Sequence, residues 1–466
     1  MVQILSWSYV IVAVVLLFGA AVFVHEFGHF WMARRRGLKV EGFAIGFGPK
    51  ILGWSRDGID YAWRWIPAGG YVKLPQMVTS EALEGKSEGT EPLPPISPFS
   101  RILVALAGPL MNVVFAFVIA TVLYFVGLPI AVNPSIIGQV DPDSPEARLG
   151  IRAGDRIVAV NGKLVRSWQD VQMAAALALT NVLPVTVERD GVQHTYPLTA
   201  RVNEQVGLKL FDLDPKEHPV IVEVLAGSAA EKAGLKKEDV VLSFAGVPVV
   251  GQQQLISLIQ KRPDRPSTIE VMRGKERLKL AVTPALDPAG KVGRLGVLIS
   301  PNTTTVYVVQ RPGPLPWETM DDVCQQVLGT LTALVHSKQT GVGVKDLSGP
   351  PGILAMLAAQ VKADYRLALK FMVLLNISLA VLNLLPVPVL DGGHIMMAIF
   401  EKLRGRPLSA RIQEYATTAF AVLLISFMLY VSYNDIRRFP LFKSMFSQQV
   451  QIESGGGDSN PPAPAR

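Results

Sequence analysis

Four long apolar stretches without charged residues constrain this chain more than any other feature of its sequence. They run from Trp7 to Val24, from Ile102 to Ile130, from Phe371 to Leu390 and from Tyr415 to Tyr433. A helix needs about 20 such residues to cross a bilayer. Only 18% of the 466 residues are charged, against about a quarter in soluble domains. We therefore expect a multi-pass α-helical membrane protein with four transmembrane helices in a lipid bilayer.

The basic residues beside these stretches predict how the chain crosses the membrane. No basic residue precedes the first stretch, which also lacks a small-residue cleavage site, so we interpret it as a retained helix and not a signal peptide. Arg34, Arg35, Arg36 and Lys39 follow it. Because cytoplasmic loops are enriched in Lys and Arg, we expect residues 31–101 to be cytoplasmic and the amino terminus to be external. The basic residues Arg437, Arg438 and Lys443 after the fourth stretch run against this orientation.

Charge and cysteine content narrow the functional classes. The formal charge of +7 is spread beside apolar stretches, where it suits lipid headgroups, and forms no long basic block, so nucleic-acid binding is not expected. Cys324 is the only cysteine, which excludes an intrachain disulfide. Any metal site must therefore be built from His, Asp and Glu.

The sequence HEFGH at residues 25–29 continues the first apolar stretch. His25 and His29 lie four residues apart, so on a helix both imidazoles face the same side and reach one tetrahedral metal. Glu26 lies beside them, where it can act as general base toward a metal-activated water. Ionisable groups in a membrane helix cost about 2.5–3.5 kcal/mol each on insertion scales. We therefore interpret the three residues as functional and not as a chance match.

A catalytic zinc needs a third protein ligand, and Asp391 in NLLPVPVLDGGH is the best candidate. In the expected topology the first and third stretches run in the same direction, so His25 and Asp391 reach a similar depth. Pro386 and Pro388 must break the third helix before Asp391. The alternative is an ordinary turn aspartate before two glycines. The predicted metal is Zn²⁺, although two His and one carboxylate also suit iron. His394 is interpreted as a hydrated interfacial histidine, with a spare metal ligand as the alternative.

The long polar region between the second and third stretches contains a repeat. GQVDPDSPEARLGIRAGDRIVAVNGKLV begins at Gly138 and VEVLAGSAAEKAGLKKEDVVLSFAGVPV at Val222. Both resemble PDZ domains of bacterial proteases, which predicts two inserted α/β modules. The expected organisation is residues 1–130 with two transmembrane helices and a hairpin loop, PDZ domains at 131–215 and 216–305, juxtamembrane helices and two further transmembrane helices at 306–447, and a disordered tail at 448–466.

The loop after HEFGH predicts β-hairpins beside the membrane, because near-alternating apolar patterns broken by Gly begin at Gly42, Tyr61 and Gly69. Residues 80–98, rich in Pro and Glu, are predicted to be a flexible linker.

Together these stretches resemble the site-2 protease family of intramembrane metalloproteases, and most closely its regulator-of-sigma-E protease subgroup. The matching segments occur in the family's order over most of the chain: HEFGHFWMARR, FAIGFGPK, PAGGYVKL, AGPLMN, LSGPPGI and NLLPVPVLDGGH. One departure is Ser378, where the family's pattern suggests a second asparagine.

The resemblance implies a function and residue roles. It implies an intramembrane zinc endopeptidase of a bacterial inner membrane that cuts transmembrane segments of single-span proteins, such as anti-sigma factors or remnant signal peptides, in regulated intramembrane proteolysis during stress responses. The PDZ pair would lie on the external or periplasmic side and bind peptide or protein tails, or filter substrates by size. The implied zinc ligands are His25, His29 and Asp391, the catalytic residue is Glu26, and the substrate-binding residues are Asn383, Pro386, Pro388, Gly46, Phe47 and Gly48.

Two other functional classes stay open. A membrane scaffold would use the PDZ modules to bind protein tails and the metal only for structure, although a purely structural zinc is usually closed by four protein ligands. An ion transporter would use the intramembrane His and Glu, but it would be expected to show inverted hydropathy repeats, and none is evident.

Overall fold

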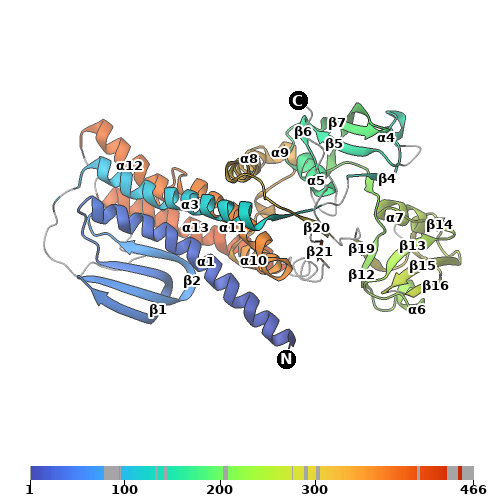
Figure 1. The fold of residues 1–466 in the computed structure, drawn as a ribbon, viewed down its shortest axis with the longest axis horizontal. Coiled ribbons are helices and arrows are strands. Elements are labelled where there is room, and N and C mark those ends of the chain that lie inside the picture. Colours follow the sequence, from blue (N-terminus) through green and yellow to red (C-terminus); the bar gives the residue numbers. More distant parts are fainter. Residues whose placement is uncertain are drawn as a thin grey trace. The chain divides into compact units, whose positions relative to one another are not determined.

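The computed structural model describes residues 2–77, 94, 96–131, 135–140, 144–202, 208–274, 276–287, 292–300, 305–406, 410–437 and 450–453. The chain divides into two compact units (Figure 1). The membrane unit comprises residues 1–129, 310–329 and 344–446 and holds the long helices. The module unit comprises residues 130–309, 330–343 and 447–466 and holds most of the short strands.

The membrane unit is built on four long apolar helices, α1 (Val2–Arg35), α3 (Pro98–Val126), α11 (Tyr365–Asn383) and α13 (Ala410–Arg437). Within the described residues, these four are long and apolar enough to cross a membrane, as expected from the sequence. Helix α3 packs against both α1 and α11. It therefore forms the centre of the layer that carries the histidines.

Two helix ends differ from the predicted stretches. The second stretch was expected to reach Ile130, but α3 ends at Val126, because Gly127 takes φ 85° and turns the chain into strand β3 (Leu128–Ala131). The third was expected to span residues 371–390, but α11 begins at Tyr365 and ends at Asn383. Pro386 and Pro388 follow outside the helix, since proline supplies no backbone N–H to continue it.

Shorter helices complete the membrane unit and lead into the module unit. They are α8 (Pro316–Val335), α9 (Ser337–Thr340), the 3-10 helix η1 (Val344–Asp346), α10 (Pro350–Ala363) and α12 (Asp391–Arg404). The LSGPPGI segment forms the start of α10. There the buried Asp435 of α13 accepts hydrogen bonds from the backbone N–H groups of Gly349 (2.8 Å) and Gly352 (2.9 Å), which joins α13 to the amino end of α10.

The predicted hairpin region forms two long antiparallel strands, β1 (Gly42–Arg56) and β2 (Ile59–Lys73). Both strands curl, so residues 42–45 pair with residues 60–63 on one side and with residues 70–73 on the other. Gly46 (φ 87°) and Gly48 (φ 84°) adopt the left-handed backbone that this bend needs. Residues 70–73 thus form one edge of the curled sheet.

The segment predicted as the first PDZ module has its own apolar core between Ile137 and Leu213. A four-stranded sheet in the order β6-β5-β7-β8 forms its centre. Its elements are β4 (Ile137–Gln139), α4 (Pro145–Arg148), β5 (Arg156–Val160), β6 (Lys163–Leu164), α5 (Trp168–Leu177), β7 (Val182–Arg189), β8 (Val192–Thr199), β9 (Arg201–Val202), β10 (Lys209–Leu210) and β11 (Asp214–Pro215).

The segment predicted as the second module has a separate core between Ile221 and Leu295. Its sheet runs β16-β15-β13-β12-β19, so β19 is an edge strand. Its elements are β12 (Val220–Val224), α6 (Ala229–Lys232), β13 (Val240–Phe244), β14 (Val247–Pro248), α7 (Gln252–Gln260), β15 (Ser267–Arg273), β16 (Glu276–Val282), β17 (Ala285–Asp287), β18 (Val292–Arg294) and β19 (Val297–Ser300).

The internal repeat is visible in matching ion pairs. Arg189 donates to Asp155 at 2.6 Å and to the carbonyl of Gly150 at 2.8 Å. Arg273 donates to Asp239 at 2.7 Å and to the carbonyl of Gly234 at 2.8 Å. The two modules therefore share a framework and not only a sequence pattern.

Two sequence predictions fall largely outside the described residues. Of the predicted linker at residues 80–98, only residues 94 and 96–98 are described. In the segment predicted to be a disordered tail, β21 (Val450–Glu453) differs from the prediction, because it pairs in parallel with β20 (Thr305–Gln310). The remainder of that tail lies outside the described residues.

Candidate metal centre

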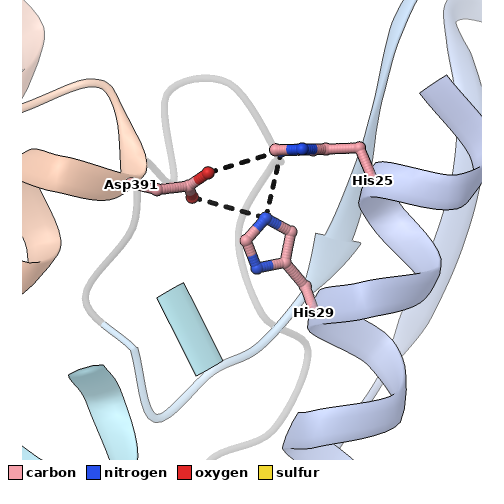
Figure 2. Close-up of side chains that lie close together, drawn as sticks. All are labelled: His25, His29 and Asp391. Atoms are coloured by element: carbon pink, nitrogen blue, oxygen red, sulfur yellow. Dashed lines mark hydrogen bonds and ion pairs between the residues drawn. The ribbon is translucent and has the colours of Figure 1, made fainter. Parts of the chain in front are cut away.

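The HEFGH segment forms one turn of the continuous helix α1, so His25 and His29 project from the same side (Figure 2). Their Nε2 atoms lie 3.1 Å apart. Both side chains are largely buried, with 14% and 12% exposed. Two imidazole nitrogens this close and aimed at one point are typical of ligands to one metal ion.

Asp391 lies opposite the two histidines at the first residue of α12 (Figure 2). Its Oδ2 is 3.4 Å from His25 Nε2 and its Oδ1 is 3.4 Å from His29 Nε2. Oδ2 is buried and has no hydrogen-bond partner. Its position depends on the two glycines that follow, because a Cβ on Gly392 would lie 2.3 Å from the carbonyl oxygen of Leu384 and one on Gly393 2.2 Å from that of Val387. The Asp-Gly-Gly sequence thus folds α12 tightly against the preceding turn.

The triangle of donor atoms fits a tetrahedral metal. The two Nε2 atoms lie 3.1 Å apart, and each lies 3.4 Å from a different carboxylate oxygen of Asp391. His25, His29 and Asp391 each offer one ligand atom, and these atoms all lie within 4.8 Å of one another. Ligands about 2.0–2.2 Å from a tetrahedral zinc are roughly 3.3–3.5 Å apart. If all three residues bind one ion, they would leave the fourth position of a tetrahedral zinc open, as in catalytic zinc sites.

Glu26 occupies the same cavity as the three candidate ligands. It is only 9% exposed. Strand β2 closes over it, since a Cβ on Gly70 would lie 2.8 Å from Glu26 Cγ. The carboxyl group is therefore held beside the triangle and away from bulk water.

The predicted substrate residues divide into three groups. Asn383 and Phe47 line the cavity, and Asn383 Nδ2 lies 3.4 Å from His25 Nε2. Gly46 and Gly48 bend the strand on either side of Phe47. Pro386 and Pro388 are not among the described residues that line the cavity; they lie in the turn between α11 and α12.

Three features of the site go beyond the sequence predictions. His394 lines the cavity, where burial lowers its pKa and so favours the neutral imidazole. Helix α3 contributes the carbonyl of Val104, 2.8 Å from His29 Nδ1, and the amide of Asn112, 3.3 Å from His25 Nδ1. The segment AGPLMN, at residues 107–112, was the only sequence signal for this face of α3.

Comparison with known proteins identifies the family. The model of peptidase family M50 matches residues 13–427. The chain belongs to peptidase family M50. This confirms the resemblance to site-2 proteases and makes the chain a metallopeptidase. M50 is a family of zinc-dependent peptidases, so zinc is its cofactor, and the donor triangle fits that ion.

Similar proteins cover nearly the whole chain. "Protease RseP" of Yersinia pestis is 30% identical over 456 residues, 93% of this chain and 99% of its own. "Regulator of sigma-E protease RseP" of Salmonella typhimurium is 30% identical over 460 residues, 93% and 100% of the two chains. "Putative zinc metalloprotease" of Xylella fastidiosa is 33% identical over 446 residues, 90% and 96%. With its four apolar helices, this M50 member is a bacterial inner-membrane protein.

One solved structure, the PDZ domain of an SdrC-like protein from Listeria monocytogenes, is similar to part of the chain. It is 16% identical and covers 18% of this chain and 87% of its own, with a TM-score of 0.17. A likeness this low adds nothing to the fold described above.

Proposed function

We propose that this M50 metallopeptidase hydrolyses peptide bonds within the transmembrane segments of single-span membrane proteins. One observation carries the proposal: the triangle of His25, His29 and Asp391 is joined to a helix long enough to cross a membrane, with Glu26 beside it. A peptidase of the aqueous phase would have no reason to accept the cost of ionisable groups in such a helix.

Each residue of the site has a distinct role in this proposal. His25, His29 and Asp391 hold zinc. When bound, zinc polarises the scissile carbonyl and lowers the pKa of the attacking water. Glu26 takes a proton from that water and returns it to the leaving amine. The nearly enclosed position of Glu26, in the same cavity as the three proposed ligands, would restrict the orientations that its carboxylate can adopt.

The curled sheet would hold the substrate in an extended form. A helical substrate hides its peptide bonds in its own hydrogen bonds, so it must unwind before attack. Residues 70–73 form an edge of the sheet, and Gly70, Tyr71 and Val72 also line the cavity. An extended segment that pairs with this edge would pass beside Glu26. Asn383 would bind a freed backbone group, and Phe47 would contact a substrate side chain.

The other parts of the chain would select substrates. The two modules are proposed to be PDZ domains on the periplasmic side that bind peptide tails or exclude large substrates. In the second module, β19 is a sheet edge, and Gln252 of α7 donates to the carbonyl of Ile299 in that strand at 3.0 Å. The substrates proposed are single-span proteins already shortened by another protease, such as anti-sigma factors or remnant signal peptides.

The decisive experiment compares Glu26→Gln with the parent protein on a model single-span substrate in proteoliposomes. We expect cleavage to fall by at least about 10²-fold, because general base catalysis is lost, while zinc content stays unchanged. Glu276→Gln makes the same chemical change on an exposed strand residue and should cleave normally. Unchanged cleavage by Glu26→Gln would remove the proposed mechanism.

Metal analysis, combined with the cleavage assay, distinguishes the proposed peptidase from a membrane scaffold and from an ion transporter. Purified protein should contain zinc rather than iron, and His29→Ala and Asp391→Asn should lose both zinc and cleavage. If the protein were a scaffold with a structural metal, these variants would lose zinc but the parent protein would not cleave the substrate. If it were an ion transporter, the parent protein would conduct ions and would not cleave the substrate.

A further inference from the structure

One side of α3 forms a wall behind both histidines. Val104, Gly108 and Asn112 follow one another at intervals of four residues, so they lie on the same side of the helix. Val104 and Asn112 are both 0% exposed. A Cβ on Gly108 would lie 2.2 Å from His29 Nε2 and 2.9 Å from His25 Cε1. The missing side chain of Gly108 therefore lets α3 approach both imidazole rings closely.

The contact with Val104 determines which nitrogen of His29 carries its proton. His29 Nε2 faces Asp391, and His29 Nδ1 lies 2.8 Å from the carbonyl oxygen of Val104. A carbonyl can only accept a hydrogen bond, so Nδ1 must donate. In a neutral imidazole this leaves Nε2 with a free lone pair, which is the form that binds a metal.

His25 needs the same arrangement, and Asn112 is the residue beside it. His25 Nε2 also faces Asp391, so its proton belongs on Nδ1, which lies 3.3 Å from Asn112 Nδ2. Two donors would then face each other, while Asn112 Oδ1 is buried without a hydrogen-bond partner. A half turn of the amide about Cβ–Cγ exchanges the two atoms. It places Oδ1 against the Nδ1–H and satisfies both groups.

We propose that Asn112 is a positioning residue for the metal centre. Its Oδ1 accepts a hydrogen bond from His25 Nδ1–H, which keeps His25 Nε2 unprotonated and aimed at the position between His29 and Asp391. Asn112 acts through His25 and touches neither metal nor substrate. The inference rests on the proposed ligand set of His25, His29 and Asp391. Loss of such an outer hydrogen bond typically weakens metal affinity by about 10–100-fold.

The test measures zinc affinity of the full-length protein in detergent by competition with a chelator. Asn112→Leu keeps the approximate size of the side chain but has no acceptor, so its zinc affinity should fall by about 10–100-fold. Asn112→Asp restores an acceptor, and carboxylate–histidine–zinc arrangements are common, so its affinity should stay close to that of the parent. If Asn112→Leu does not remain monodisperse, Asn112→Ala takes its place, because it removes the amide without adding bulk.

A matched control separates this role from the loss of any buried amide. Asn376 in α11 is also 0% exposed, but its Nδ2 donates to the carbonyl of Met372 in its own helix, at 2.8 Å. Asn376→Leu should therefore bind zinc like the parent. The inference is overturned if Asn112→Leu keeps parental affinity, if Asn112→Asp loses as much as Asn112→Leu, or if Asn376→Leu loses as much.

The ligand set itself is tested in the same assay. His25→Ala and Asp391→Asn should abolish zinc binding. If either binds zinc like the parent, the ligand set is wrong. If both lose zinc while Asn112→Leu retains it, the ligand set stands and only the role of Asn112 is wrong.

Discussion

The membrane unit and the module unit both bury polar and charged groups, but they satisfy them differently. In the module unit, Asp239 is 0% exposed and fully engaged by Arg273 and the N–H of Lys236. Lys209, 1% exposed, donates to the carbonyl of Ala178 at 2.8 Å and to Asn181 Oδ1 at 3.2 Å. These groups hold secondary elements together and have little capacity left for a ligand.

In the membrane unit, buried polar atoms are left without partners. Among the described residues, all of the buried side-chain nitrogen and oxygen atoms that lack a hydrogen bond lie in this unit, except Glu146 Oε2. Asp391 Oδ2 and Asn112 Oδ1 are two of them, and both belong to the metal centre. An unsatisfied buried polar group costs about 1–3 kcal/mol. The metal centre is where two such atoms coincide with a group of candidate ligands. Others in this unit, such as Asn376 Oδ1 and Asp435 Oδ1, belong to residues that make contacts within or between helices.

The substitution expected to have the largest effect on zinc binding, and to test this comparison most directly, adds a methyl group at Gly108. Gly108→Ala places a Cβ 2.2 Å from His29 Nε2, so His29 must move out of the triangle. We expect zinc affinity to fall by more than about 100-fold, beyond the 10–100-fold typical of a lost outer contact, with cleavage lost in parallel. The measurement is chelator competition together with cleavage of the single-span substrate.

The control is the same substitution where there is space. A Cβ on Gly19, also within a membrane helix, meets nothing within 4 Å. Gly19→Ala should leave zinc affinity unchanged and slightly favour the helix. If Gly108→Ala bound zinc as tightly as the parent protein, α3 would not pack closely against the two histidines.

The next largest effect is expected in the modules, where removing a buried ion pair should lower the stability of the module without changing zinc binding. Asp239→Asn leaves Arg273 without its counter-charge, and breaking a buried pair typically costs about 3 kcal/mol. Hydrogen exchange of the full-length protein should show faster exchange in residues 220–282, with zinc affinity unchanged. Asp287→Asn is the control, because its partner Arg294 is 71% exposed and such pairs contribute about 0–1 kcal/mol. A loss of zinc in Asp239→Asn would contradict the separation of roles.

The sequence predicted best those features that depend on local spacing. The i, i+4 pair of His25 and His29 needs only a helix, and the prolines before Asp391 require a break there whatever surrounds them. Asn112 could not be assigned a role from sequence, because nothing in its local pattern shows that it faces His25, 87 positions away. Helix ends were also missed: hydropathy alone placed residues 128–130 in a helix, whereas Gly127 directs them into a strand.

The smallest expected effect is a pH dependence confined to the modules. Asp214 of β11 lies at the start of α7 and accepts a hydrogen bond from the N–H of Gln254 at 3.1 Å. Burial raises the pKa of Asp214 to about 6 despite that bond. The folded state therefore binds this proton more tightly than the unfolded chain, whose aspartate pKa is about 3.9. Linkage then requires module stability to be highest below about pH 4 and to fall as pH rises through about 6, by about 3 kcal/mol in total.

Asp214→Asn should remove this dependence, since the amide does not titrate. At pH 7.5 we expect the variant to exchange amide hydrogens in α7 more slowly than the parent does, and at pH 4 the two should be similar once intrinsic exchange rates are corrected. Asp190→Asn, at an exposed turn, should keep the parental pH profile. An unchanged profile in Asp214→Asn would show that this buried carboxyl, like Asp239, is satisfied in its charged form, and the contrast between the two units would become sharper.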